Sequence, residues 1–65
     1  MKEFMNPGCG RCILLQQHNK TFIAAIVETK EFVVASCLSE DGSWIYGNYF
    51  TDIRDAAEFF HKEIA

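Results

Sequence analysis

The sequence has a single proline, few basic residues and no long hydrophobic run, and each shortage excludes a class of protein. Its apolar stretches are shorter than the ~18 residues that a membrane-spanning helix needs, so we expect no membrane insertion. Lysine and arginine number 6 against 9 acidic residues, a net charge of −3. Binding along a nucleic-acid backbone requires a basic stripe, so nucleic acid is not an expected partner. A hydrophobic fraction of 49% excludes a disordered tail.

The first seven residues lack the long apolar region of a secretory signal and include Glu3, so we expect a cytoplasmic protein. At 65 residues the chain is long enough for one domain. A single core of this size leaves only about 3–5 kcal/mol of net stability without a staple or a partner. Chain length alone therefore leaves open whether the domain is stabilised by oligomerisation or by a ligand.

We expect a flexible leader followed by one folded domain. Residues 1–11 contain a cluster of residues that break regular structure, Pro7, Gly8 and Gly10, and include the start of a Cys-x-x-Cys motif. Residues 12–65 form the domain, with strands predicted at 21–29, 32–39 and 44–50 and turns between them. Residues 12–18 fit a strand or a short helix, and we favour the strand.

The C-terminal helix follows the last predicted strand directly. Its apolar residues recur with a period of 3.6 and form one stripe: Ile53, Ala56, Ala57, Phe60 and Ile64. Asp52 is placed to cap the first turn, and Asp55 adds negative charge where the helix dipole favours it. Glu58 and Lys62 form an i, i+4 pair expected to contribute about 0.3–0.5 kcal/mol. The expected fold is α+β, a βββα domain: a three- or four-stranded antiparallel meander with one C-terminal helix packed on one face.

Both faces of the predicted sheet are apolar, whereas an antiparallel sheet with one wet face alternates apolar and polar residues. Strict alternation sorts the side chains into two sets in each strand: Phe22, Ala24 and Ile26 against Ile23, Ala25 and Val27; Phe32, Val34 and Leu38 against Val33, Ala35 and Cys37; Trp44, Tyr46 and Phe50 against Ile45 and Tyr49. One helix covers one face. The other face needs the leader, a second copy of the chain or a different protein as its cover.

Cys9 and Cys12 form the one motif that could carry chemistry. Two thiolates at this spacing can share a zinc ion, with further ligands drawn from His18, Cys37 and His61. A redox pair, a disulfide and two plain thiols are the other interpretations. Cys37 alternates into a strand face, where a buried thiol is expected. We assign no metal ligand and no cofactor.

No enzymatic site can be assembled from the remaining residues. The two histidines have no serine or aspartate at the spacing of a nucleophilic triad, and we expect both at the surface or an edge. Six acidic residues have structural reasons to occur where they do, either in a turn or along the helix: Glu40, Asp41, Asp52, Asp55, Glu58 and Glu63. We therefore expect a protein that is not an enzyme.

Aromatic side chains are the best candidates for a contact patch. Trp44, Tyr46 and Tyr49 can pack across strands, or they can bind a partner, because tryptophan and tyrosine bury a large area at a small entropy cost. Phe59 lies beside the helix stripe, at the core margin or in a contact. We take Trp44, Tyr46, Tyr49 and Phe59 as the candidate partner-binding residues.

From Thr21 onward the order of strands, turns and helix resembles the HicB-like antitoxin domain. That family has a glycine shortly before a helix that opens Thr-x-x-Glu-Ala, and here Gly47 precedes Asp52-Ile53-Arg54-Asp55-Ala56. Residues 39–42 replace the proline-rich loop of the family, and no DNA-binding tail follows the helix. The resemblance implies a protein that neutralises another protein by binding it.

We therefore expect a small acidic module that binds another protein, forms a homodimer, and inhibits or regulates its partner by occupying its surface. Inhibitors carried by phages and mobile elements, including anti-CRISPR proteins, are similarly small and acidic and act in the same way, by binding another protein. The alternatives are a small zinc-stabilised domain and a thiol redox protein that uses Cys9 and Cys12.

Overall fold

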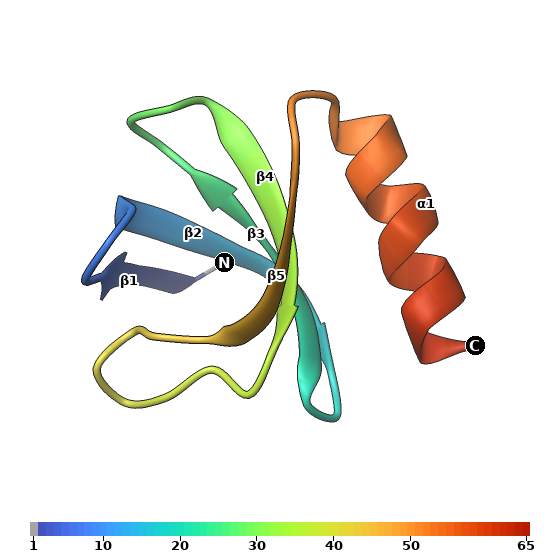
Figure 1. Ribbon diagram of the computed structural model, residues 1–65, viewed down its shortest axis with the longest axis horizontal. Coiled ribbons are helices and arrows are strands. Elements are labelled where there is room, and N and C mark those ends of the chain that lie inside the picture. The colour runs from blue at the N-terminus through green and yellow to red at the C-terminus, as the bar shows by residue number, and fades with distance from the viewer. Residues whose placement is uncertain (1) are drawn as a thin grey trace.

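The computed structural model describes residues 2–65, which form one antiparallel sheet and one helix (Figure 1). The sheet has 5 strands in sequence order, and the helix follows the last of them. The elements are β1 (Lys2–Asn6), β2 (Gly10–His18), β3 (Thr21–Ile26), β4 (Glu31–Ser36), β5 (Ile45–Phe50) and α1 (Ile53–Ile64). The expected α+β class and antiparallel meander are confirmed, but the number of strands is higher than predicted. None of the described helices is long and apolar enough to cross a membrane.

The additional strand lies within the segment expected to be a leader. β1 pairs with β2 from Lys2 opposite Leu14 to Asn6 opposite Gly10. Of the breaking residues that predicted a loop, Pro7 and Gly8 instead lie in the turn of this hairpin, and Gly10 is the first residue of β2. The Oδ1 atom of Asn6 accepts hydrogen bonds from the backbone N–H groups of Gly8 at 2.9 Å and Cys9 at 2.7 Å, which closes an Asx-type turn. The structure-breaking residues thus end strand β1, but they do not prevent it from forming.

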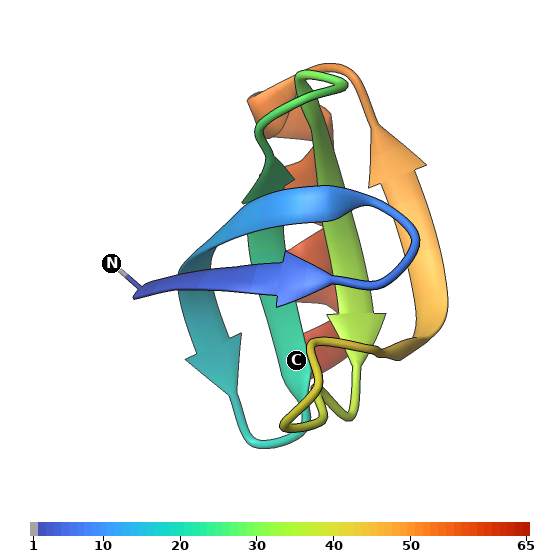
Figure 2. The same ribbon diagram turned by 90° about the vertical axis from the view of Figure 1, so that its left-hand side faces the viewer.

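The sheet curls, so that β1 and the first part of β2 lie across β3 and β4 (Figure 2). This curl encloses the first of two cores, which we call the inner core. Its buried residues are Cys12, Phe22, Ala24, Ile26, Val33 and Ala35. Phe4 of β1 and Leu38 and Trp44 of the β4–β5 connection are partly buried against it. The chain itself therefore covers much of the sheet face opposite the helix, through its first strand and this connection.

The second core, the helix-side core, lies between the sheet and α1. It consists of Ile23, Val34, Ala56 and Phe60. The helix stripe is confirmed at its centre, where Ala56 and Phe60 are buried, but Ile53 at its first turn is 41% exposed. Asp52 caps the helix as predicted, because its side chain accepts a hydrogen bond from the backbone N–H of Arg54 at 2.8 Å. Among residues 2–65 the one ion pair joins Arg54 and Asp52, so the predicted pair of Glu58 and Lys62 is not formed.

A β-bulge in β2 lets two consecutive residues pack into different cores. Leu14 pairs with Ala24 and Gln16 pairs with Ile23, which leaves Leu15 as an extra residue. Leu14 packs against the inner core and Leu15 against the helix-side core. The bulge is accompanied by the strong bend that brings β1 across the sheet.

Asn6 also fixes the β4–β5 connection to β1. Its Nδ2 atom donates a buried hydrogen bond to the carbonyl oxygen of Gly42 at 2.8 Å. Gly42 has φ +88, and a Cβ atom there would lie 1.7 Å from the carbonyl oxygen of Met5. Both its backbone conformation and this close approach require glycine. From the sequence alone, Gly42 is expected only in a turn between the strands predicted at 32–39 and 44–50.

Candidate protein-binding surface

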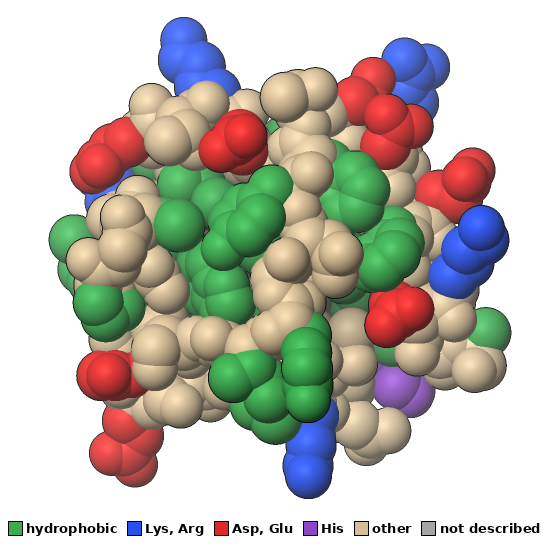
Figure 3. Space-filling model, in the orientation of Figure 1, with side chains coloured by type: hydrophobic (Ala, Val, Ile, Leu, Met, Phe, Trp, Pro, Cys, Tyr) green, Lys and Arg blue, Asp and Glu red, His purple; other side chains and the backbone are tan. Residues whose placement is uncertain are grey.

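β5 is the edge strand that follows the connection, and it is exposed along most of its length. Residues 45–49 are all exposed, among them three large hydrophobic side chains, Ile45, Tyr46 and Tyr49. In Figure 3 hydrophobic side chains gather on both sides of β5, and other surface separates the two groups. An edge strand presents unpaired backbone groups, and β5 combines these with exposed apolar side chains.

Tyr46 lies in a bulge that changes the direction of its side chain. Ser36 pairs with Ile45 and Val34 with Asn48, so Tyr46 and Gly47 together oppose Ala35. Tyr46 has φ +56 and is 77% exposed. A left-handed backbone costs a residue with a Cβ atom about 1–2 kcal/mol. The chain therefore holds a large aromatic side chain in solvent at a strained position.

The bulge places Trp44 and Tyr46 on opposite sides of β5, although strict alternation predicted both on one face. Trp44 packs edge-on against Phe22 of the inner core, with ring centroids 5.8 Å apart, and against Phe4 at 6.2 Å. Its Nε1–H donates a hydrogen bond to the hydroxyl oxygen of Tyr49 at 3.2 Å. Trp44 and Tyr49 thus lie together on the side away from α1. Trp44 is half-buried and contributes mainly to the core.

Tyr46 and Phe59 lie on the other side of β5, next to the helix. Both line a small hollow of about 100 Å³, together with Asn48 and Glu63 among others. Phe59 is half-buried and packs against Phe50 with ring centroids 5.4 Å apart. The four predicted partner-binding residues therefore form two pairs, Trp44 with Tyr49 and Tyr46 with Phe59, on opposite sides of one strand.

A second hollow of about 280 Å³ shares one lining residue, Phe59, with the first. It is lined by Phe50, Asp55, Glu58, Phe59 and Lys62. We call the two hollows together the β5–α1 groove. From the sequence, Asp55 is expected only to favour the helix dipole, and Glu58 and Lys62 only to pair with each other. The signal was present, because Asp55, Glu58, Phe59 and Lys62 occur at helical i, i+3, i+4 and i+7 positions and form one face of α1.

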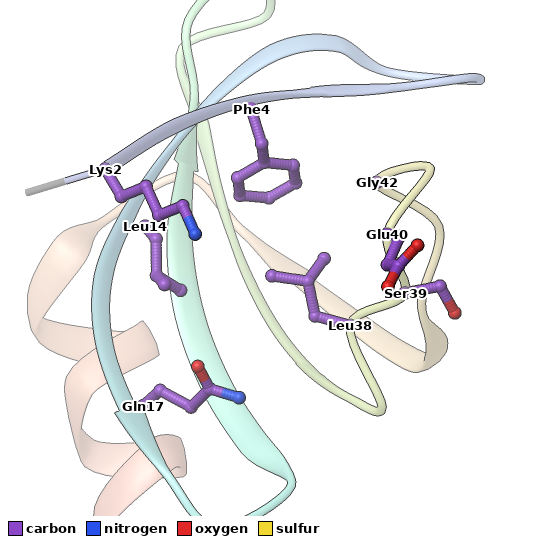
Figure 4. A pocket seen from close by; sticks show the side chains of 8 residues that line it. All are labelled: Lys2, Phe4, Leu14, Gln17, Leu38, Ser39, Glu40 and Gly42. Carbon is purple, nitrogen blue, oxygen red and sulfur yellow. The ribbon is translucent and has the colours of Figure 1, made fainter.

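A further hollow, of about 310 Å³, lies elsewhere, between β1, β2 and the β4–β5 connection (Figure 4). Phe4, Leu14 and Leu38 are its apolar lining residues, and Lys2 and Glu40 add one charge of each sign. The sequence does not predict this hollow, because its walls come from segments far apart in the chain. Its balanced charges favour no particular class of partner.

The three cysteines are free and differ in exposure. Cys12 is fully buried, and burial raises the pKa of its thiol, with further increases from the nearby Cys9 and Glu28. A raised pKa keeps this thiol protonated and weakens it as a nucleophile or metal ligand. Cys37 is exposed, so its predicted burial is wrong. β4 ends at Ser36, and the left-handed φ of +58 at Cys37 turns Leu38 toward the inner core instead.

No cluster of three or more histidine, cysteine or acidic residues suited to a metal ion occurs within residues 2–65. Both histidines, His18 and His61, are exposed, as expected. The zinc interpretation of Cys9 and Cys12 gains no further ligand from the described part of the chain.

Comparison with known proteins found no match: no protein-family model, no curated protein and no solved structure is significantly similar to the chain. The resemblance to the HicB-like antitoxin domain rests on the residues quoted for it and stays a prediction.

Proposed function

We propose that the protein is a non-enzymatic module that binds another protein through β5 and inhibits or regulates that partner by occupying its surface. The observation that carries this proposal is the exposed aromatic edge strand. Tyr46 is 77% and Tyr49 is 49% exposed on a strand that ends the sheet. Exposed tyrosines are typical anchors of protein interfaces, and a sheet edge can accept a further strand.

The proposed contact is strand β5, and not the sheet face opposite the helix. The sequence predicts an apolar sheet face that the helix does not cover, but Phe4, Leu38 and Trp44 cover much of this face from within the chain. The apolar side chains that stay exposed are concentrated on β5 instead. The binding edge therefore replaces the sheet face as the proposed contact.

The small size and the HicB-like order of elements favour an antitoxin-like protein or an inhibitor from a phage or mobile element, such as an anti-CRISPR protein, acting in the cytoplasm. A homodimer formed through β5 is the version of this proposal in which the partner is a second copy. Light scattering on the purified protein at micromolar concentration tests this version. A monomer that becomes a dimer with rising concentration, but not when Tyr46 is replaced by alanine, would support it.

The binding proposal is tested by capture from the native host, followed by binary affinity measurements with the purified candidate. We expect Tyr46→Ala and Tyr49→Ala each to weaken binding about tenfold or more, as tyrosine anchors do. Lys20→Ala, at an exposed hairpin turn, is the matched control and should bind like the parent. Equal affinity of all variants with unchanged folding would refute a contact through β5.

A further inference from the structure

We infer that the β5–α1 groove binds an extended segment of a partner protein that directs arginine side chains into the groove. This inference rests on the proposed function and specifies the chemistry of the partner. Three features of the groove carry it: an aromatic floor, an excess of carboxylates beside it, and its position along an open strand edge.

The floor of the groove is aromatic. Phe50 and Phe59 form its centre, their rings tilted by 44° to each other, and both are only half-buried. Tyr46 extends the aromatic lining toward the C-terminal end of the helix, where Glu63 lies. Aromatic faces attract cations through their quadrupole, and arginine uses this contact more often than lysine. The floor thus suits a flat cation as well as an apolar group.

The charges beside the groove are unbalanced. Asp55, Glu58 and Glu63 contribute three carboxylates, and Lys62 contributes the single ammonium. None of these four takes part in an ion pair within residues 2–65. The charge therefore favours a positively charged occupant and disfavours an acidic one. Arginine fits better than lysine, because its planar guanidinium can stack on a ring and bind a carboxylate with two hydrogen bonds.

The position of the groove favours an extended occupant. It follows β5, the strand that ends the sheet. A strand added at that edge directs alternate side chains to opposite faces. One set would enter the groove, and the other would lie near Tyr49, which is exposed on the side of β5 away from α1. The expected partner sequence therefore alternates arginine with apolar, β-branched residues.

The test uses an eight-residue peptide of alternating arginine and valine with a fluorescent label, and its binding is measured by anisotropy at low and at physiological salt. Matched peptides replace every arginine by lysine or by glutamate. We expect the arginine peptide to bind most tightly, the lysine peptide several-fold more weakly and the glutamate peptide not measurably. Affinity should fall as salt rises, because the carboxylates are exposed and screened.

Variants of the protein locate the site. The double variant Glu58→Gln and Glu63→Gln should lower affinity for the arginine peptide about three- to tenfold, the range of two exposed ion pairs. Glu40→Gln, far from the groove, is the control and should have no effect. Phe59→Ala should lower affinity further, but because it also removes a packed ring, the charge variants decide the outcome.

Two results would overturn the inference. One is equal binding of the arginine and glutamate peptides, and the other is an equal effect of the double variant and Glu40→Gln. If either occurs while the captured partner still depends on Tyr46 and Tyr49, the binding function stands and only the basic occupant is wrong. If the arginine peptide behaves as expected but Tyr46→Ala and Tyr49→Ala leave the captured partner bound, the proposed use of β5 by that partner fails instead.

Discussion

Single residues with a left-handed backbone decide where the aromatic side chains lie. Tyr46 and Cys37 both have a positive φ without being glycine, and both reverse the alternation of the strand that they belong to or follow. Such strain costs about 1–3 kcal/mol at each position and persists only where the surroundings hold it in place. At Tyr46 it maintains an exposed ring beside the β5–α1 groove, at the point where partner contact is proposed.

The strain at Tyr46 predicts opposite effects on stability and on binding. Tyr46→Gly should raise the free energy of unfolding by about 0.5–1 kcal/mol, because glycine adopts this φ freely and the ring buries little surface. The same change should weaken partner binding. Tyr46→Ala is the control, because alanine keeps the Cβ atom and should gain no stability. Urea denaturation of the three proteins checks this, and a destabilised glycine variant would contradict it.

At the scale of elements, the helix was predictable and the first strand was not. The period of its apolar residues and the Asp52 cap predict helix α1, because both signals lie within the helix segment itself. β1 has little β-branched character and is followed by Pro7 and Gly8, so only its pairing with β2 makes it a strand. The groove residues on α1 could also be read from their spacing, but their contact with Phe50 is tertiary.

The cap predicts how helix stability depends on pH. Hydrogen bonds from the side chain and backbone of Arg54 hold the pKa of Asp52 below its ordinary value of 3.8. A lowered folded pKa means that the stabilisation is complete above the unfolded value and is lost as pH falls through the folded one. Asp52→Asn keeps a capping oxygen but does not titrate. Its melting temperature should therefore lie below the parent's at pH 7 and approach it near pH 2.

A difference between Asp52→Asn and the parent that is equally large at pH 7 and at pH 2 would contradict this assignment. Asp41 also has a lowered pKa, from its hydrogen bonds with Ser43, so both proteins will lose some stability in acid. The contribution of Asp41 is the same in both proteins, so it cancels when their melting temperatures are compared at each pH. Only the part that depends on residue 52 tests the cap.

At the scale of the whole molecule, the chain closes its own inner core by bringing β1 and the β4–β5 connection together. Asn6 joins them through its hydrogen bond to Gly42, and Phe4 and Trp44 pack where they meet. Composition predicted that both sheet faces are apolar and left three possible covers open. It could not choose among them, because the choice depends on contacts across 36 residues of sequence.

The closure predicts a sharp contrast between neighbouring residues of β1. Phe4→Ala should lower the free energy of unfolding by about 2–4 kcal/mol, because it removes a ring that packs against Phe22 and Trp44. Met5→Ala should change it by less than about 0.5 kcal/mol, since Met5 is 62% exposed. Denaturant unfolding measures both. Similar values for the two variants would show that β1 does not close the core.

The most direct test of β5 as the binding edge is amide hydrogen exchange of the protein alone and in complex with its captured partner. We expect the partner to slow exchange in residues 45–50 and on the Phe59 side of α1, and to leave β1 and residues 38–42 unchanged. Protection confined to β1 and residues 38–42, with β5 exchanging as fast as in the free protein, would contradict the account.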